Sequence, residues 1–259
     1  MHAFFDQLYQ SIDAHRDGAA PFSLQAHDAH VRSLDRHGAH DVFGCRIAAL
    51  PGVYQPHPWS SSVFLVRSLL REARPLGRVL DLGCGSGVVG LSLHHHGLAS
   101  SAVLVDIDQQ CVATARQNIA ALGVASQVQV RHGDLFAPVH GEMFDTVIFN
   151  MPLLQLAHDG MRHLALDDTG GALAARFFDE VLDYLAPGGR GYFAYSNVSQ
   201  IAAFTAVQDR AALRMLAAEW VPARGFGLAL FEFAHHPGRH TLSRQPATMP
   251  RSPAAPPAG

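Results

Sequence analysis

The chain has 259 residues, of which 48% are hydrophobic, and its formal net charge is −3. This length and composition suffice for one sizeable globular domain and exclude an intrinsically disordered protein. No run of 18 or more apolar residues occurs, and Asp6 interrupts the start of the chain where a secretory signal needs an apolar block. We therefore expect a cytoplasmic protein that does not interact with a membrane.

All 19 basic residues are arginines. The lack of lysine excludes P-loop nucleotide-binding enzymes, pyridoxal enzymes and short-chain dehydrogenases, because each of them needs a lysine for its chemistry. The negative net charge and the lack of an arginine cluster predict that the protein does not bind nucleic acid. Cys45, Cys84 and Cys111 have no metal-ligand spacing, so we expect no metal site.

Residues 1–44 predict a short helical extension, because apolar residues recur at helical spacing between positions 4 and 12 and residues 23–38 form a second, more polar candidate helix. Such helices cannot form a core alone, so we expect them to dock on the rest of the chain, as packing or as a lid over a site. Residues 45–75 predict a hairpin closed by Pro51 and Gly52, and then a helix capped by a serine.

Strand-like and helix-like segments alternate from Gly77 onward, which predicts repeated βαβ units and a parallel sheet with helices on both faces. Residues 214–223 and 228–236 predict two further strands at the edge of this sheet. The expected fold class is therefore α/β, a doubly wound, Rossmann-like sheet of about seven strands over residues 76–236. Residues 237–259 are rich in proline and alanine and predict a disordered tail.

The segment VLDLGCGSGVVG, residues 79–90, runs from a strand directly into a helix and places Gly83, Gly85 and Gly87 at the turn. Glycines let the backbone approach a ligand closely, and the start of a helix offers unpaired amide groups. Gly85 to Gly90 also fits the G-x-G-x-x-G pattern of dinucleotide-binding enzymes, and Asp106 follows at the distance of a ribose-binding acid. By this pattern alone, an NAD(P)-dependent oxidoreductase stays open.

Acidic residues accompany three successive strands of the expected sheet. Asp81 precedes the first glycine, Asp106 ends the second strand and Asp134 follows the third. With these acids and the glycine turn, the chain resembles the class I S-adenosylmethionine-dependent methyltransferases over about residues 46–234. Asp108 is also close to the second strand, but an aspartate there is more typical of a helix N-cap.

The resemblance implies a role for each matching residue. Gly83, Gly85 and Gly87 line the methionine part of S-adenosylmethionine, and Asp81 lies near its ammonium group. The ribose hydroxyls are held by Asp106 and the adenine amino group by Asp134. Two apolar residues that directly follow these acids, Ile107 and Leu135, are also expected at the cofactor.

The fourth strand ends on Asn150, Met151 and Pro152. In the same family, a group with Asn-Pro-Pro-Tyr at this place methylates amide and amine nitrogens, and the release-factor glutamine methyltransferases are most similar to this chain. The resemblance implies that Asn150 borders the cofactor and that its side-chain oxygen and the Met151 carbonyl accept hydrogen bonds from the acceptor nitrogen, while Pro152 fixes the turn. Leu153 replaces an aromatic residue that would stack on a planar acceptor.

We therefore predict an S-adenosylmethionine-dependent methyltransferase that acts on a nitrogen of a small molecule or a peptide. Three alternatives remain open. The first is an enzyme that cyclises or transfers the aminocarboxypropyl arm of the same cofactor and releases methylthioadenosine. The others are an NAD(P)-dependent oxidoreductase and a cofactor-binding module without catalytic activity.

Overall fold

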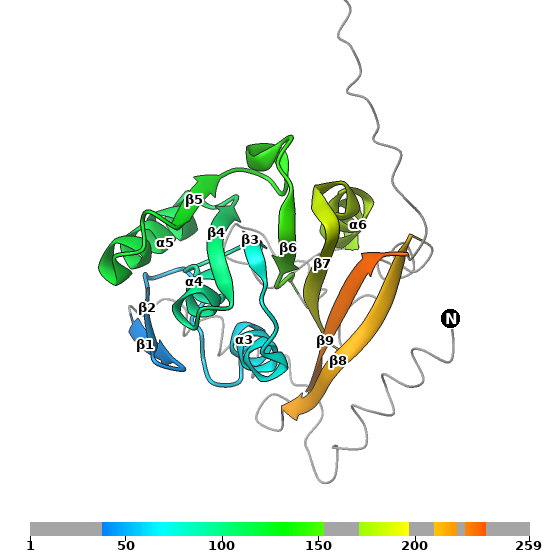
Figure 1. Cartoon of the computed structure of the whole chain (residues 1–259). Coiled ribbons are helices and arrows are strands. Elements are labelled where there is room, and N and C mark those ends of the chain that lie inside the picture. The colour runs from blue at the N-terminus through cyan, green and yellow to red at the C-terminus, as the bar shows by residue number, and fades with distance from the viewer. Residues whose placement is uncertain (1–37, 153–170, 197–209, 222–225, 237–259) are drawn as a thin grey trace, which may run out of the picture.

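The structure is a computed structural model that describes residues 38–152, 171–196, 210–221 and 226–236 (Figure 1). The predicted N-terminal helices and C-terminal tail lie outside these residues. Seven strands form one sheet in the order β5-β4-β3-β6-β7-β9-β8, which confirms the predicted fold class. In chain order the strands are β3 (Gly77–Leu82), β4 (Ala99–Asp106), β5 (Val128–His132), β6 (Phe144–Phe149), β7 (Leu185–Ser196), β8 (Ala211–Val221) and β9 (Phe226–His235).

Strands β3 to β7 are parallel to one another, and β9 is antiparallel to both of its neighbours, β7 and β8. The predicted pair of late strands is therefore confirmed. The strand order reverses at β3, because β4 lies on one side of it and β6 on the other. In open α/β sheets, ligands bind at the carboxyl ends of the strands beside such a reversal. The fold thus places a site next to the ends of β3 and β6.

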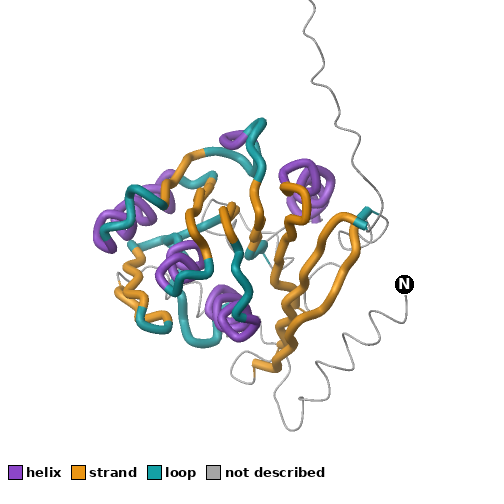
Figure 2. The backbone as a smooth tube through the Cα atoms, viewed as in Figure 1, coloured by secondary structure: helices purple, strands orange, loops and turns teal. Residues whose placement is uncertain are grey.

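Helices cover both faces of the sheet (Figures 1 and 2). Three of them pack on one face: α3 (Ser61–Glu72), α4 (Val88–His95) and α5 (Gln109–Leu122). The opposite face carries α6 (Ala172–Glu180) and two short 3-10 helices, η1 (Ala137–Val139) and η4 (Val181–Tyr184). Successive residues of β3 point into opposite cores, with Val79 on the α3 side and Leu80 on the α6 side. This explains why the strand sequences are continuously apolar rather than alternating.

Hydrogen bonds from side chains fix where two of these helices begin. As predicted, a serine caps α3, since Ser60 Oγ accepts a bond from the Val63 amide at 3.3 Å. Asp108 caps α5 in the same way, because its Oδ1 accepts from the Gln110 amide at 2.8 Å. Each cap satisfies an amide that the first turn of a helix leaves without a partner.

A separate two-stranded sheet precedes α3 and consists of β1 (Gly38–Val42) and β2 (Cys45–Ala49). The prediction that Pro51 and Gly52 close this hairpin is wrong. Phe43 and Gly44 close it, with φ values of +53° and +87°, while Pro51 and Gly52 form a turn after β2. Residues 38–44, predicted as the end of the helical extension, therefore form β1 and the turn of this hairpin instead.

None of the helices in the described ranges is both long and apolar enough to span a bilayer. Within the same ranges, no group of three or more His, Cys, Asp or Glu side chains is arranged to hold a metal ion.

Candidate cofactor and acceptor site

The turn between β3 and α4 presents three glycines at the carboxyl edge of the sheet. Gly83, Gly85 and Gly87 have φ values of +59°, +56° and +80°, a region that favours glycine. A Cβ at Gly83 would lie 3.0 Å from the Phe149 ring, and one at Gly87 would lie 2.9 Å from Leu91, so packing alone requires these two glycines. A Cβ at Gly85 would meet no atom of the described residues within 4 Å. Gly85 therefore borders open space, as a residue that faces a ligand does.

Asp106, the last residue of β4, is only 8% exposed and binds the glycine turn. Its Oδ2 accepts a hydrogen bond from the Gly85 amide at 2.8 Å, and its Oδ1 accepts one from the Asp108 amide at 2.9 Å. Burial raises the pKa of Asp106, and these backbone bonds oppose that rise. A carboxylate has about four lone-pair positions, so these backbone bonds still leave capacity to accept a hydroxyl group.

Asp81, on β3, lies beneath the same turn and is almost fully buried. Its Oδ2 accepts a hydrogen bond from the Gly90 amide in α4 at 2.9 Å. Burial raises the pKa of Asp81 to about 7, although the Gly90 bond lowers it, and the negative charge of Asp106 adds to the rise. A cationic group in this space would stabilise both carboxylates. The ammonium group of S-adenosylmethionine is such a cation, so these acids fit that cofactor.

The ends of β4 and β5 form a second part of the site. Ile107 is 47% exposed, and its carbonyl oxygen lies 2.9 Å from His132 Nε2. Leu135 is buried and has a φ of +44°, which is unusual for a residue other than glycine. Asp134 Oδ2 accepts a hydrogen bond from Arg176 Nη2 of α6 at 2.6 Å. Sequence reasoning did not find Arg176, because it lies 42 residues away and belongs to no motif.

Asn150 follows β6 directly, just as Gly83 follows β3, and the last residues of these two strands, Phe149 and Leu82, are paired. The structure therefore brings Asn150 next to the glycine turn. Its Oδ1 atom is buried and has no hydrogen-bond partner among the described residues. Leaving a buried acceptor unpaired costs about 1–3 kcal/mol, so a ligand that offers an N–H group to this oxygen would be stabilised. Met151 is buried and Pro152 half-buried, while Leu153 lies outside the described residues.

Residues 44–202 match the family model of the methyltransferase small domain. The match covers more than half of the chain, and the chain belongs to this family. The chain therefore carries a methyltransferase domain, and the cofactor of this domain is S-adenosylmethionine rather than a nicotinamide nucleotide.

Two curated relatives illustrate the range of the family. The release factor glutamine methyltransferase of Cereibacter sphaeroides is 32% identical over 158 residues, which are 61% of this chain and 51% of that protein. The ribosomal RNA small subunit methyltransferase C of Shigella flexneri is 34% identical over 125 residues, or 48% of this chain and 34% of that protein. The chain thus spans about half or less of the length of these relatives.

Solved structures share the fold at low sequence identity. Trm5 of Methanocaldococcus jannaschii, in complex with adenosine, superimposes with a TM-score of 0.55 and 16% identity over 77% of this chain and 56% of that one. TrmK of M. capricolum, in complex with S-adenosylhomocysteine, gives a TM-score of 0.51 and 12% identity over 69% of this chain and 70% of that one. At these identities the likeness establishes the fold alone.

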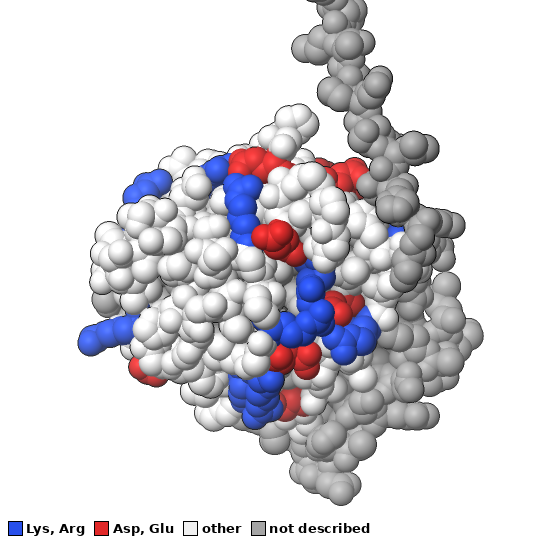
Figure 3. All heavy atoms as spheres, in the orientation of Figure 1, with Lys and Arg blue, Asp and Glu red and all other residues white. Residues whose placement is uncertain are grey.

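The prediction that nucleic acid has no part in the function is wrong, because a ribosomal RNA methyltransferase is among the relatives and tRNA methyltransferases are among the structures with this fold. The physical reason is that net charge is a sum over the whole chain, whereas phosphate binding depends on local charge. Arginines do gather locally: Figure 3 shows basic and acidic side chains intermingled along one face. Among the ion pairs of the described residues, Glu142 pairs with Arg78 and Arg131, and Glu232 pairs with Arg74 and Arg214.

Proposed function

We propose that the chain transfers the methyl group of S-adenosylmethionine to a nitrogen atom that Asn150 positions, and that this nitrogen is an amino group of an RNA base. The observation that carries the proposal is the buried Asn150 Oδ1 beside the glycine turn, to which no described residue donates a hydrogen bond. An oxygen there accepts hydrogen bonds and so selects an acceptor that carries N–H groups. The RNA acceptor is supported by the ribosomal RNA methyltransferase relative.

The residues that would hold the cofactor follow from the same geometry. Asp106 accepts the ribose hydroxyls through the free lone pairs of its two oxygens, and Asp81 attracts the ammonium group. Gly85 leaves space for the methionine part, since no atom lies within 4 Å of its missing Cβ. When bound, the cofactor supplies an electrophilic methyl group on a sulfonium. The protein keeps that group and the acceptor in one fixed position.

The main contribution that we expect from Asn150, Met151 and Pro152 is to position the acceptor nitrogen. An amino nitrogen on a planar ring delocalises its lone pair, so the nitrogen must be held with that lone pair directed at the methyl carbon. The Asn150 side-chain oxygen and the Met151 carbonyl each accept one N–H bond, and Pro152 restricts the backbone between them and the next segment. The nitrogen gains a methyl group and loses one proton to solvent.

A second acceptor, the side-chain amide of a protein glutamine, is supported by a specific observation. The release factor glutamine methyltransferase matches 61% of this chain, a larger share than the ribosomal RNA enzyme matches. An amide presents the same planar N–H group to Asn150. To separate the two, the protein is incubated with methyl-labelled S-adenosylmethionine and either ribosomal RNA, transfer RNA or release factors, and the labelled product is digested and analysed. Label in a nucleoside supports an RNA base as the acceptor. Label in glutamine refutes the RNA base and supports the protein glutamine as the acceptor.

The same digest tests the alternative chemistry of the cofactor. Methyl transfer leaves S-adenosylhomocysteine, whereas reaction of the aminocarboxypropyl arm leaves methylthioadenosine. If methylthioadenosine is the only product, methyl transfer is not the reaction.

Replacing Asn150 by alanine tests its role. We expect kcat/KM to fall about 100-fold or more, because a misplaced reacting atom is costly, while the Kd of S-adenosylhomocysteine changes by no more than about 3-fold. Asn150→Asp, which keeps an acceptor oxygen, serves as the matched variant and should retain more activity than Asn150→Ala. Calorimetry gives the Kd and initial rates give kcat/KM. Equal losses in both quantities would mean that Asn150 only supports the fold, and unchanged rates would refute the proposal.

A further inference from the structure

An ion pair joins helix α6 to the loop after β5. Arg176 Nη2 donates a hydrogen bond to Asp134 Oδ2 over 2.6 Å. The two side chains are 52% and 42% exposed, so the pair lies at the surface of the site rather than in the core. No hydrogen bond from any other described residue reaches the carboxylate of Asp134. The Oδ1 atom of Asp134 is therefore free to accept a bond from a ligand.

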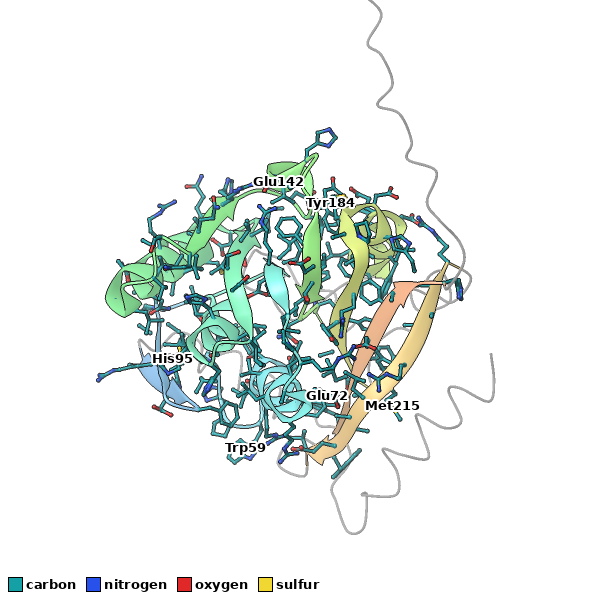
Figure 4. All side chains as sticks on the ribbon, in the orientation of Figure 1. Trp59, Glu72, His95, Glu142, Tyr184 and Met215 are labelled. Carbon is teal, nitrogen blue, oxygen red and sulfur yellow. The ribbon has the colours of Figure 1, made fainter. Side chains whose placement is uncertain are left out.

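Aromatic stacking holds the same two segments together. The ring of Phe136 stacks on Phe177 of α6, with centroids 5.9 Å apart and planes inclined by 14°. It also stacks on Tyr184 of η4, at 4.3 Å and 18°. Tyr184 is labelled in Figure 4. Between Asp134 and Phe136, Leu135 adopts a positive φ of 44°, at a cost of about 1 kcal/mol. The backbone is thus held in an unfavourable conformation that turns Phe136 toward α6, and such strain is common at functional sites.

The position of α6 gives this ion pair access to the site. Because β7 is parallel to β6 and α6 leads into it through η4, α6 runs back from the carboxyl edge of the sheet, where the glycine turn and Asn150 lie. Arg176 is in the middle of α6, and Asp134 follows β5 at the same edge, with only Gly133 between them. Arg176 of α6 therefore contacts the segment after β5 at the edge of the sheet that carries the glycine turn.

We infer that Arg176 is a positioning residue for adenine recognition. Its guanidinium holds Oδ2 of Asp134 and so directs Oδ1 at the amino group of adenine. A carboxylate that already accepts one bond from a guanidinium loses less freedom when it accepts a second bond than a free exposed carboxylate, which must be ordered first. This inference concerns the cofactor end of the site and does not depend on which acceptor is methylated.

If Arg176 acts on adenine recognition, its loss changes the choice between two bases, whereas the loss of a residue that only supports the fold does not. Adenine offers an N–H donor to Asp134, whereas hypoxanthine has a carbonyl oxygen at the same place, which a carboxylate repels. Wild-type protein should therefore bind S-adenosylhomocysteine at least about 10-fold more tightly than S-inosylhomocysteine, as expected for a hydrogen bond to a charged group. If Arg176 orders the carboxylate, this preference depends on Arg176.

The experiment measures the Kd of both ligands by calorimetry for the wild type and for Arg176→Ala, Arg176→Lys and Asp134→Ala. Arg210→Ala is the matched control. Arg210 also binds α6, through the carbonyl of Asp179 at 2.8 Å and the side chain of Asp179 at 3.5 Å, and none of these contacts involves Asp134. We expect Arg176→Ala to raise the Kd of S-adenosylhomocysteine about 3- to 10-fold. The ratio of the Kd values of S-inosylhomocysteine and S-adenosylhomocysteine should fall about 3-fold or more. Arg176→Lys should recover part of the preference, and Arg210→Ala should keep all of it.

Asp134→Ala should abolish the preference, and adding Arg176→Ala to it should cause no further change in either Kd, since the two residues act through one bond. The inference fails if Arg176→Ala keeps the wild-type preference, whether both affinities are unchanged or both weaken equally. It also fails if Asp134→Ala still discriminates between the two bases. Thermal unfolding of each variant confirms that the protein is folded in every measurement.

Discussion

At the scale of single residues, Asp106 has two tasks that its geometry combines. Its carboxylate holds the amides of Gly85 and Asp108, so it fixes both the glycine turn and the start of α5. The same oxygens keep free lone pairs for hydroxyl groups. A substitution at Asp106 therefore changes the shape of the site as well as its hydrogen bonds.

We expect Asp106→Ala to weaken S-adenosylhomocysteine binding by about 1.5–3 kcal/mol, the value typical of hydrogen bonds to a charged group. Asp106→Asn keeps one acceptor oxygen but places an N–H group near the Gly85 amide, so it should bind more weakly than the wild type as well. Calorimetry with S-adenosylhomocysteine measures both losses. A change of less than about 2-fold in Asp106→Ala would contradict the assigned role.

Asp81 makes stability depend on pH in an unusual direction. Burial raises the pKa of Asp81 in the folded protein from 3.8 to about 7, so the folded state binds this proton more tightly than the unfolded state. The contribution of Asp81 to stability is therefore most favourable below pH 4, declines as the pH rises toward 7 and is constant above that. Asp81→Asn removes this dependence. The difference in Tm between the variant and the wild type should therefore increase from pH 5 to pH 8. Thermal unfolding without ligand measures this difference. A difference that is independent of pH would contradict the raised pKa of Asp81.

At the scale of elements, substitutions in the turn between β3 and α4 can show which glycines affect cofactor binding and which affect only the stability of the fold. Gly85 and Gly97 both have a positive φ, +56° and +74°, and a Cβ at either would meet no atom within 4 Å. Only Gly85 belongs to the turn that faces the site. The two glycines therefore form a matched pair for the same substitution.

Gly85→Ala and Gly97→Ala should each lower the free energy of unfolding by about 1 kcal/mol, because alanine is strained at positive φ. We expect only Gly85→Ala to weaken S-adenosylhomocysteine as well, by about 10-fold or more, since its methyl group would occupy the space left for the cofactor. Denaturant unfolding and calorimetry measure the two effects. Equal affinities for the two variants would show that the open space at Gly85 is not part of the site.

The β1–β2 hairpin shows why the turn that closes it was predicted at the wrong residues. Pro51 and Gly52 are residues that favour turns, whereas Phe43 is poorly suited to a positive φ. The structure offsets this cost locally, because the Gly44 amide donates a hydrogen bond to Asp41 Oδ1 at 2.9 Å. Farther away, Asn118 of α5 binds both the amide and the carbonyl of Ala48. Propensity alone cannot weigh such a contact between distant residues.

At the scale of the whole molecule, the sequence predicted the sheet and the residues at its carboxyl edge. Apolar runs identify strands buried on both faces, and parallel strands bring their carboxyl ends to one edge, so Gly85, Asp106 and Asn150 could be grouped in advance. The partner of Asp134 could not. Arg176 is exposed and distant in the chain, and only the packing of α6 selects it from among 19 arginines. The prediction about nucleic acid was wrong for a related reason, because the net charge of a chain carries no information on where its charges lie.

Strand β9 lies between β7 and β8, although β8 comes before it in the chain. During synthesis on a ribosome, the five parallel strands and the complete glycine turn emerge first. The residues of β8 emerge next, but the sheet offers them no neighbour until β9 has followed and paired with β7. The cofactor end of the protein can therefore assemble on a nascent chain whose opposite edge is still open. A message truncated between β8 and β9 would yield a chain with the apolar edge of β7 uncovered, which is a surface prone to aggregation.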